Sequence, residues 1–238
     1  MEVLEAIQNR RSVRKYMNVP VEWEKIGRVV DAGRIAPSAG NVQDRRFIVV
    51  VDEGVRKKLA DAALHQNWMV QAPVHIAICS FVDKIKRMYG IRGERLYSIQ
   101  NAAASAMQMM LAAESMGLAT CWVGAFEENM VQRALGCPDE VRVSVILTLG
   151  YADEKPKAPA RFTIEHVTNF NGYGGNAKKI LDIGTVLWNH NIAGRASKEA
   201  KQTVSDVKAL SVDERKKLSE KIKSSTKRLT EGFRKKGK

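Results

Sequence analysis

Apolar residues in the first 150 positions follow two patterns, helical spacing and short continuous runs. Continuous apolar runs that are rich in β-branched residues are typical of strands buried on both faces. Four such runs predict four strands. They are RFIVVV (46–51), APVHIAICS (72–80), LATCWVGAF (118–126, where the strand passes into a loop) and VRVSVILTLGY (141–151).

Segments with helical spacing separate these strands. They predict helices at residues 2–11, 21–33, 54–65, 96–116 and 127–136. The helix at 96–116 is rich in Ala and Met and almost free of charge. We therefore expect it to be buried on all sides, in a large core or at a subunit interface. Strands that alternate with helices predict an α/β or α+β sandwich with one main core, which ends near residue 175.

The composition changes after residue 175. Residues 176–238 hold 17 Lys and Arg against 7 Asp and Glu, a net charge of +10 out of the +13 of the whole chain. We expect two parts, a folded domain at 1–175 and a basic extension at 176–238 with one or two exposed helices. A capping-box pattern at 211–214 precedes an apolar stripe at Leu218 and Ile222. The extension is open to three interpretations: a solvated appendage, a helix that wraps a second subunit, or a polyanion-binding tail.

Several classes of protein are not expected. No run of about 18 apolar residues predicts a membrane helix, and the N-terminus lacks the apolar stretch of a secretory signal. The three cysteines lack C-x-x-C spacing and the four histidines lack ligand partners, so we expect no metal site. Unpaired cysteines suit a reducing compartment, which favours a cytoplasmic protein. The extension has neither interleaved aromatic residues nor a nucleic-acid motif, so nucleic acid is a disfavoured partner.

The stretch RRSVRKY (10–16) follows the first predicted helix and concentrates positive charge there. Arg10 and Arg14 would lie near one another with Ser12 between them. Guanidinium groups bind phosphate oxygens in pairs, and a serine hydroxyl adds a neutral donor. The stretch is therefore either a solvated helix end or an anion site.

Three further segments have a structural and a functional interpretation. APSAGNVQ (36–43) is either an ordinary turn or a loop whose small residues let a flat ligand approach, with Asn41 and Gln43 as polar contacts. Gly124 and Ala125 either begin a turn or leave the backbone N–H groups at a strand end open to a ligand. Arg161 follows a proline-rich segment and is either a surface residue or an anion contact.

Together, in this order and spacing, the four segments resemble the FMN-dependent nitroreductase family over about residues 1–175. RRSVRKY is similar to the family's R-x-S-x-R/K pattern, APSAGNVQ to its A-P-S-x-x-N-x-Q loop, and GYADEKPKAPARF (150–162) to its last phosphate contact. The resemblance implies an α+β fold, a three-layer α/β/α sandwich with a mostly antiparallel central sheet. In this chain a basic helical C-terminal extension would follow it.

The resemblance also implies roles for individual residues. The phosphate and ribityl chain of FMN would be held near the N-terminus and by Arg161, and the ring by the 36–43 loop of a partner subunit in a homodimer. Gly124 would aim its amide at flavin N5 and act in catalysis. The implied contacts are Arg10, Arg11, Ser12, Arg14, Pro37, Ser38, Ala39, Asn41, Gln43, Gln100, Trp122, Val123, Gly124, Ala125 and Arg161.

The implied reaction passes a hydride from NADH or NADPH through FMN to a small-molecule acceptor, a nitroaromatic, quinone or flavin, with ping-pong kinetics. A flavin-fragmenting or dehalogenating enzyme of the same fold is the alternative. The chain departs from the family pattern at Asp44 and Arg45, where Pro and Trp are common, at Gly124, where some members are acidic, and at Pro159. The segment 83–97 would correspond to the variable lid, and its basic character favours an anionic electron donor.

Overall fold

The centre of the molecule is a four-stranded antiparallel sheet. The computed structural model describes residues 1–169, 172–174, 214, 217 and 220. The strand order is β1-β2-β4-β3, and all three strand pairs are antiparallel. The four predicted strands are confirmed with small shifts at their ends, as β1 (Arg45–Val50), β2 (Val74–Phe81), β3 (Ala119–Val123) and β4 (Val141–Gly150).

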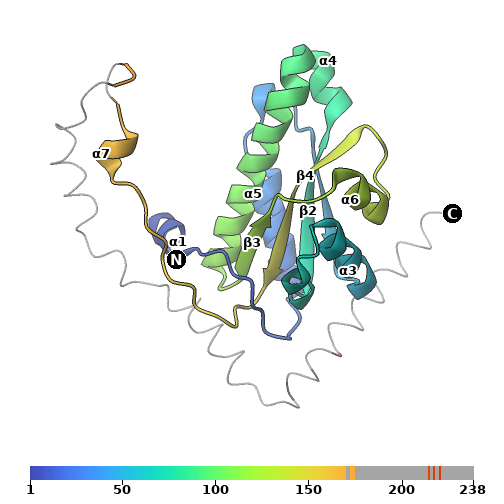
Figure 1. Cartoon of the computed structure of the whole chain (residues 1–238), viewed down its shortest axis with the longest axis vertical. Coiled ribbons are helices and arrows are strands. Elements are labelled where there is room, and N and C mark those ends of the chain that lie inside the picture. Colours follow the sequence, from blue (N-terminus) through green and yellow to red (C-terminus); the bar gives the residue numbers. More distant parts are fainter. Residues whose placement is uncertain (170–171, 175–213, 215–216, 218–219, 221–238) are drawn as a thin grey trace.

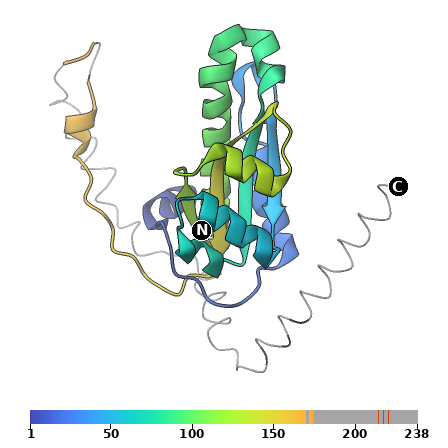
Figure 2. The same cartoon turned by 45° about the vertical axis from the view of Figure 1, so that its right-hand side comes forward.

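Helices cover both faces of this sheet and complete the predicted three-layer α+β sandwich (Figure 1; Figure 2). Because successive strand residues point to opposite faces, β2 and β4 supply side chains to two separate cores. Ile76, Ile78 and Leu147 pack with the helices of one face, and Ala77 and Ile146 with those of the other. The first face carries α2 (Trp23–Arg34) and α5 (Ser98–Ser115), and the second carries α3 (Glu53–Ala62) and α6 (Glu128–Leu135).

The long helix α5 differs from the expectation that it is buried on all sides. Its inner face is fully buried through residues such as Ala102, Ser105 and Met109. Its outer face leaves Ile99 and Met107 exposed by 48% and 43%. The single chain therefore does not bury this helix on all sides, and burial at a subunit interface, the other location expected, stays a prediction. The small alanines allow close packing on the sheet, but no described element of the same chain covers the outer face.

The remaining elements lie at the edges of the sandwich. α1 (Val3–Asn9) lies beside α5, and α4 (Val82–Arg92) leads through a π-helical turn (Gly93–Tyr97) into α5. After β4, an arm that includes α7 (Ile164–Val167) leaves the body of the molecule (Figure 1). The predicted capping box, its apolar stripe and most of the 176–238 extension lie outside the described residues. Within the described ranges, no helix is long and apolar enough to cross a membrane.

His75 is buried in β2 in its neutral form. Its Nε2 donates to the carbonyl oxygen of Met69 at 2.9 Å, and its Nδ1 has no hydrogen-bond partner. The pKa of His75 is lowered to about 4, chiefly by burial and in part by Arg56, while the hydrogen bond to Met69 acts in the opposite direction. Between this value and the usual pKa of about 6.5, the unfolded chain binds a proton that the folded protein does not.

This difference predicts a loss of stability on mild acidification. Stability is fully present above the unfolded pKa and falls as the pH drops toward the folded pKa. We expect the free energy of unfolding, measured by urea denaturation, to fall by about 2 kcal/mol between pH 7 and pH 5. A His75→Gln variant, which keeps a side-chain donor for Met69, should lose about 2 kcal/mol less over the same range. An equal loss in both proteins would show that another group causes the effect.

Candidate functional site

The basic segment, residues 10–14, runs alongside the first residues of β3. The helix α1 ends at Asn9, and the chain then becomes extended. Ser12 forms a parallel bridge with Thr120, and the amide of Val13 donates to the carbonyl oxygen of Thr120 at 3.1 Å. The edge strand therefore fixes the backbone of the basic segment.

The side chains of the basic segment surround the start of β3 and the end of α5. Burial raises the pKa of the Cys121 thiol, whereas Arg14, the Ser12 hydroxyl and Arg10 lower it. Burial also raises the pKa of Glu114, and Arg10 and Arg11 lower it. Arg10 acts on both groups, so the structure brings the predicted N-terminal residues together around the start of β3 and the end of α5. Among the described residues, no group of three metal-ligating side chains could hold a metal ion.

Two residues that the sequence did not single out hold Arg14. The carboxylate of Glu154 accepts the backbone N–H groups of Arg14 at 2.6 Å and Lys15 at 3.1 Å. The guanidinium of Arg14 lies over the ring of Trp68, 5.6 Å from its centroid. The 150–162 segment contains Glu154 but was singled out for Arg161, and both Glu154 and Trp68 reach Arg14 only through the folded topology. Arg14 is exposed, fixed through its backbone and oriented by an aromatic face.

The other two predicted phosphate contacts behave differently. Arg11 donates from Nη1 to the carbonyl oxygens of Gln8 at 2.6 Å and Arg10 at 2.8 Å, so part of its guanidinium closes the end of α1. Arg161 lies on the arm with its side chain exposed. No hydrogen bond or ion pair joins Arg161 to the basic segment within the described chain. Its phosphate contact stays a prediction.

The 36–43 loop has an unusual backbone. Gly40, Asn41 and Gln43 have positive φ angles of 51°, 55° and 49°, and residues other than glycine rarely adopt such backbone conformations. Internal hydrogen bonds support it, since the Gln43 amide donates to the Ser38 hydroxyl at 3.1 Å and the Gln43 side chain donates to Asn41 at 3.3 Å. Strained turns of this kind persist only where the surroundings determine them, and they cluster at ligand sites.

A buried polar network ties this loop to α5. Asn101 accepts from the amide of Ala39 at 2.9 Å and donates to the Asp44 carboxylate at 2.8 Å. Arg45 donates to the carbonyl oxygens of Ala36 at 2.8 Å and Pro37 at 2.9 Å, and to the Ser105 hydroxyl. Burial lowers the pKa of Arg45, and Asp44 raises it. Asp44 and Arg45, which depart from the sequence pattern described above, therefore hold the loop in place.

The predicted contacts on α5 and β3 divide into exposed and buried residues. Gln100 points outward, whereas its neighbour Asn101 makes the contact with the loop. Val123 is buried in a core, and Trp122 is 38% exposed on the sheet face that carries α5. Gly124 and Ala125 follow with exposed backbone. Three of these residues, at 122, 124 and 125, can therefore meet a ligand at the end of β3.

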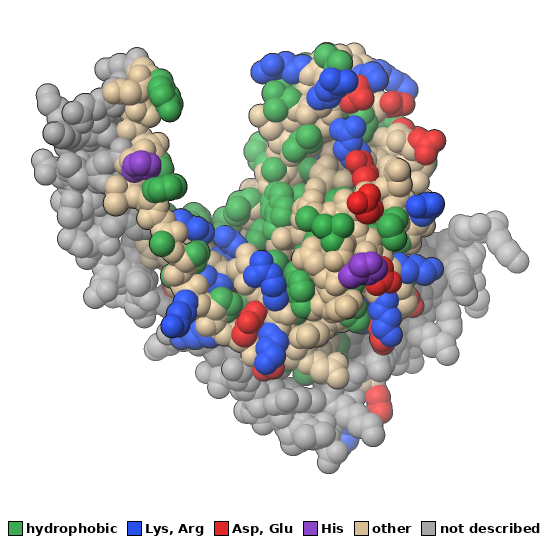
Figure 3. All heavy atoms as spheres, viewed as in Figure 1, with side chains coloured by type: hydrophobic (Ala, Val, Ile, Leu, Met, Phe, Trp, Pro, Cys, Tyr) green, Lys and Arg blue, Asp and Glu red, His purple; other side chains and the backbone are tan. Residues whose placement is uncertain are grey.

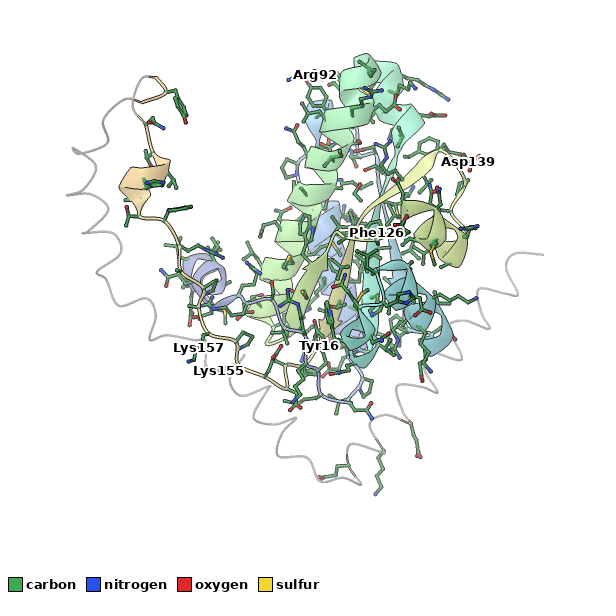
Figure 4. All side chains as sticks on the ribbon, viewed as in Figure 1. Tyr16, Arg92, Phe126, Asp139, Lys155 and Lys157 are labelled. Carbon is green, nitrogen blue, oxygen red and sulfur yellow. The ribbon has the colours of Figure 1, made fainter. Side chains whose placement is uncertain are left out.

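The loop and the basic segment lie at opposite ends of α5. The loop is attached near Asn101, and the basic segment lies near Glu114, thirteen positions further along the helix. At 1.5 Å per residue this separation is about 20 Å. In Figure 4, Tyr16, which follows the basic segment by two residues, lies at one end of the sandwich, and Arg92 of α4 lies at the other. One copy of the described chain does not bring the two predicted ligand-binding elements together.

The comparisons with known proteins agree with this architecture. The model of the nitroreductase family matches residues 7–68 and 62–151. A protein of Archaeoglobus fulgidus, whose name pairs NADH dehydrogenase with NAD(P)H nitroreductase, is 32% identical over 173 residues, which are 70% of this chain and 96% of that protein. A protein of Bacillus subtilis named FMN reductase [NAD(P)H] is 29% identical over 66% of this chain and 69% of its own length.

A solved structure extends the similarity to three dimensions. The crystal structure of a nitroreductase family protein from Clostridium difficile 630 is 30% identical in sequence and superposes with a TM-score of 0.63. The match covers 72% of this chain and 99% of that one. Fold, sequence identity and family model agree: this chain belongs to the nitroreductase family.

Proposed function

We propose that this chain is an FMN-dependent oxidoreductase that passes a hydride from NADH or NADPH to a nitroaromatic, quinone or flavin acceptor by a ping-pong mechanism. Family membership supports the flavin chemistry, and the Bacillus subtilis relative is named as an NAD(P)H-dependent FMN reductase. The observation that carries the proposal is the arrangement along β3. The basic segment runs beside its first residues, and the exposed Gly124 follows its last one.

The described residues fit FMN. Ser12 pairs with Thr120, and Gly124 lies four residues further along the strand, so a phosphate contact and a ring contact are about 13 Å apart. An elongated ligand with a dianion at one end and a flat ring at the other spans such a distance. At the first end Arg10 and Arg14 supply charge, and at the second Gly124 has no side chain to obstruct a ring.

When bound, FMN supplies the hydride chemistry that no side chain of the protein can perform. The chain positions the cofactor and the substrates. Arg10, Ser12 and Arg14 would bind the phosphate, with Glu154 fixing the backbone of Arg14. The N–H of Gly124 would donate a hydrogen bond toward N5 and so help to stabilise negative charge on the ring. The loop at 36–43 would supply the other wall of the pocket.

The proposed pocket requires a homodimer, because its two walls lie about 20 Å apart along α5 in one chain. A two-fold axis that pairs the outer faces of two α5 helices would set the loop of one copy beside the basic segment of the other. Figure 3 shows hydrophobic side chains on the surface of the body that faces the arm. Exposed apolar residues on α1 and α5 offer the area that such pairing would bury: Val3, Leu4, Ile7, Ile99 and Met107.

The purified protein should bind FMN and show the absorbance of an oxidised flavin. Oxidation of NADPH or NADH should depend on a nitroaromatic, quinone or flavin acceptor, and double-reciprocal plots at several acceptor concentrations should be parallel. Because donor and acceptor would share one pocket, a high concentration of either should inhibit. A colourless protein that does not bind FMN in a fluorescence titration would overturn the proposed function.

The phosphate assignment predicts the effect of removing the arginines. A charged hydrogen bond contributes about 1.5–3 kcal/mol, so Arg14→Ala should raise the Kd for FMN by at least about tenfold. Adding Arg161→Ala should raise it again if the arm reaches the site. Arg28→Ala is the matched control, since Arg28 is exposed on α2 and paired with Glu24. If the double variant retains FMN as tightly as the control, the phosphate assignment is wrong.

A mixed dimer tests whether the two walls come from different subunits. Gly40→Val should disrupt the loop, because Gly40 has a positive φ and an added side chain would collide with the Tyr89 hydroxyl. Arg14→Ala disrupts the other wall. Each variant alone should have little activity, and a refolded equal mixture should recover about a quarter of the wild-type value, since half of the dimers hold one intact site. No recovery despite mixed-dimer formation would place both walls in one subunit.

A further inference from the structure

Residues 82–97 form a helical hairpin that covers the 36–43 loop (Figure 1). We call this segment the basic hairpin. The hydroxyl of Tyr89 occupies the space that a side chain on Gly40 would need. Lys84 lies with its Nζ 3.4 Å from the carbonyl oxygen of Gln43. The basic hairpin is thus in direct contact with the loop that would form one wall of the flavin pocket.

Two glycines shape the turn of the basic hairpin. Gly90 has φ 56° and ψ −146°, a conformation almost confined to glycine, so the chain changes direction there. Gly93 is buried, and a Cβ on it would lie 2.5 Å from the carbonyl oxygen of Ile85. The following π-helical turn brings Tyr97 edge-on to Tyr89, with ring centroids 5.3 Å apart. π-Helical turns are frequent at functional sites.

Tyr97 orients the guanidinium of Arg92. The Nε of Arg92 donates to the Tyr97 hydroxyl at 3.0 Å, and its Cζ lies 5.5 Å from the centroid of the Tyr97 ring. The Nη atoms have no acceptor among the described residues. Arg92 is exposed, and Figure 4 shows it at the end of the molecule that carries the basic hairpin. A stacked arginine with a free Nη pair is preorganised for bidentate binding of an oxyanion.

The other charges of the basic hairpin reinforce this positive end. Residues 83–97 contain five Lys or Arg and two Asp or Glu. Lys86 is paired with Glu94 at 2.7 Å, and the guanidinium of Arg142 lies close to the same glutamate. Arg87 and Arg95 are exposed and form no ion pair within the described chain, although Arg95 helps to lower the pKa of Glu94. The basic hairpin therefore presents uncompensated positive charge next to the loop.

We propose that the basic hairpin binds the 2′-phosphate of NADPH, with Arg92 as its principal contact, and that the enzyme therefore prefers NADPH to NADH. This inference rests on the proposed function. The two donors differ only in this phosphate, which adds up to two negative charges at the adenosine end. With the nicotinamide at the flavin, the adenosine end must lie beyond the pocket wall. The basic hairpin is in direct contact with the loop that would form that wall.

Other arginines of the described chain are less suited to this role. Arg28 and Arg34 on α2 are already paired with Glu24 and Asp31. The basic segment is assigned to the phosphate of FMN. Arg45 is buried in the loop network and Arg56 donates to backbone carbonyl oxygens. Arg92 combines exposure, contact with the loop through the two tyrosines, and a free pair of donors.

The test compares both donors on the FMN-loaded enzyme. In the wild type, kcat/KM should be at least tenfold higher for NADPH than for NADH. Arg92→Gln should lower kcat/KM for NADPH by tenfold or more through KM, while the value for NADH changes less than twofold. Tyr97→Phe, which removes the acceptor of Nε, should give a smaller loss in the same direction. Arg28→Gln is the matched control and should leave both values unchanged.

A binding measurement separates this inference from the proposed function. Adenosine 2′,5′-bisphosphate should bind the wild type at least tenfold more tightly than adenosine 5′-monophosphate in calorimetry, and Arg92→Gln should remove the difference. Equal use of the two donors, or an equal loss for both in Arg92→Gln, would overturn the inference and leave the proposed function intact. Absence of FMN binding and of turnover with either donor would overturn the proposed function. The bisphosphate titration would still decide whether the basic hairpin is a phosphate site.

Discussion

The buried guanidinium of Arg45 holds the geometry on which the proposed pocket depends. It is 7% exposed and binds the carbonyl oxygens of Ala36 and Pro37 together with the Ser105 hydroxyl. Burying a charge is costly unless hydrogen bonds and an opposite charge compensate it. The adjacent Asp44 supplies that charge and is itself held by Asn101. Burying Asp44 and Arg45 costs desolvation energy, and their hydrogen bonds to the loop and to Asn101 fix the conformation of the loop.

This fixed loop explains how three residues with positive φ can coexist in four positions. A turn with this backbone has several alternatives of lower energy in a free peptide, so it forms only when its ends and its middle are held. Arg45 holds the beginning at Pro37, Asn101 holds Ala39, and the Tyr89 hydroxyl covers Gly40. The conformation of the loop is thus determined by α5 and the basic hairpin and only in part by its own sequence.

The sequence predicted the four strands and the helices α1, α2, α3, α5 and α6 because their apolar spacing is regular, but it did not predict α4 or α7. It could not predict the role of Asp44 and Arg45, since adjacent opposite charges are typical of a surface and only the packing of α5 buries them. Asn101 escaped the sequence for the same kind of reason, while the ligand contact of the exposed Gln100 stays a prediction. One step along a helix turns a side chain by about 100°, and an Ala- and Met-rich helix does not show which face is inside. The structure places Asn101, one residue on, against the loop.

The separation of the two walls also has an electrostatic consequence. Within one chain, the basic segment and the basic hairpin lie beyond opposite ends of the stretch from Asn101 to Glu114, which is itself about 20 Å long and so more than two Debye lengths at physiological salt. A single chain can therefore carry both groups with little mutual repulsion. In the proposed two-fold dimer, the basic segment of one copy and the basic hairpin of the other would border the same pocket. The positive charges of these two segments would then repel one another unless anions were bound between them. Binding of the flavin phosphate or of the dinucleotide phosphate would therefore stabilise the dimer.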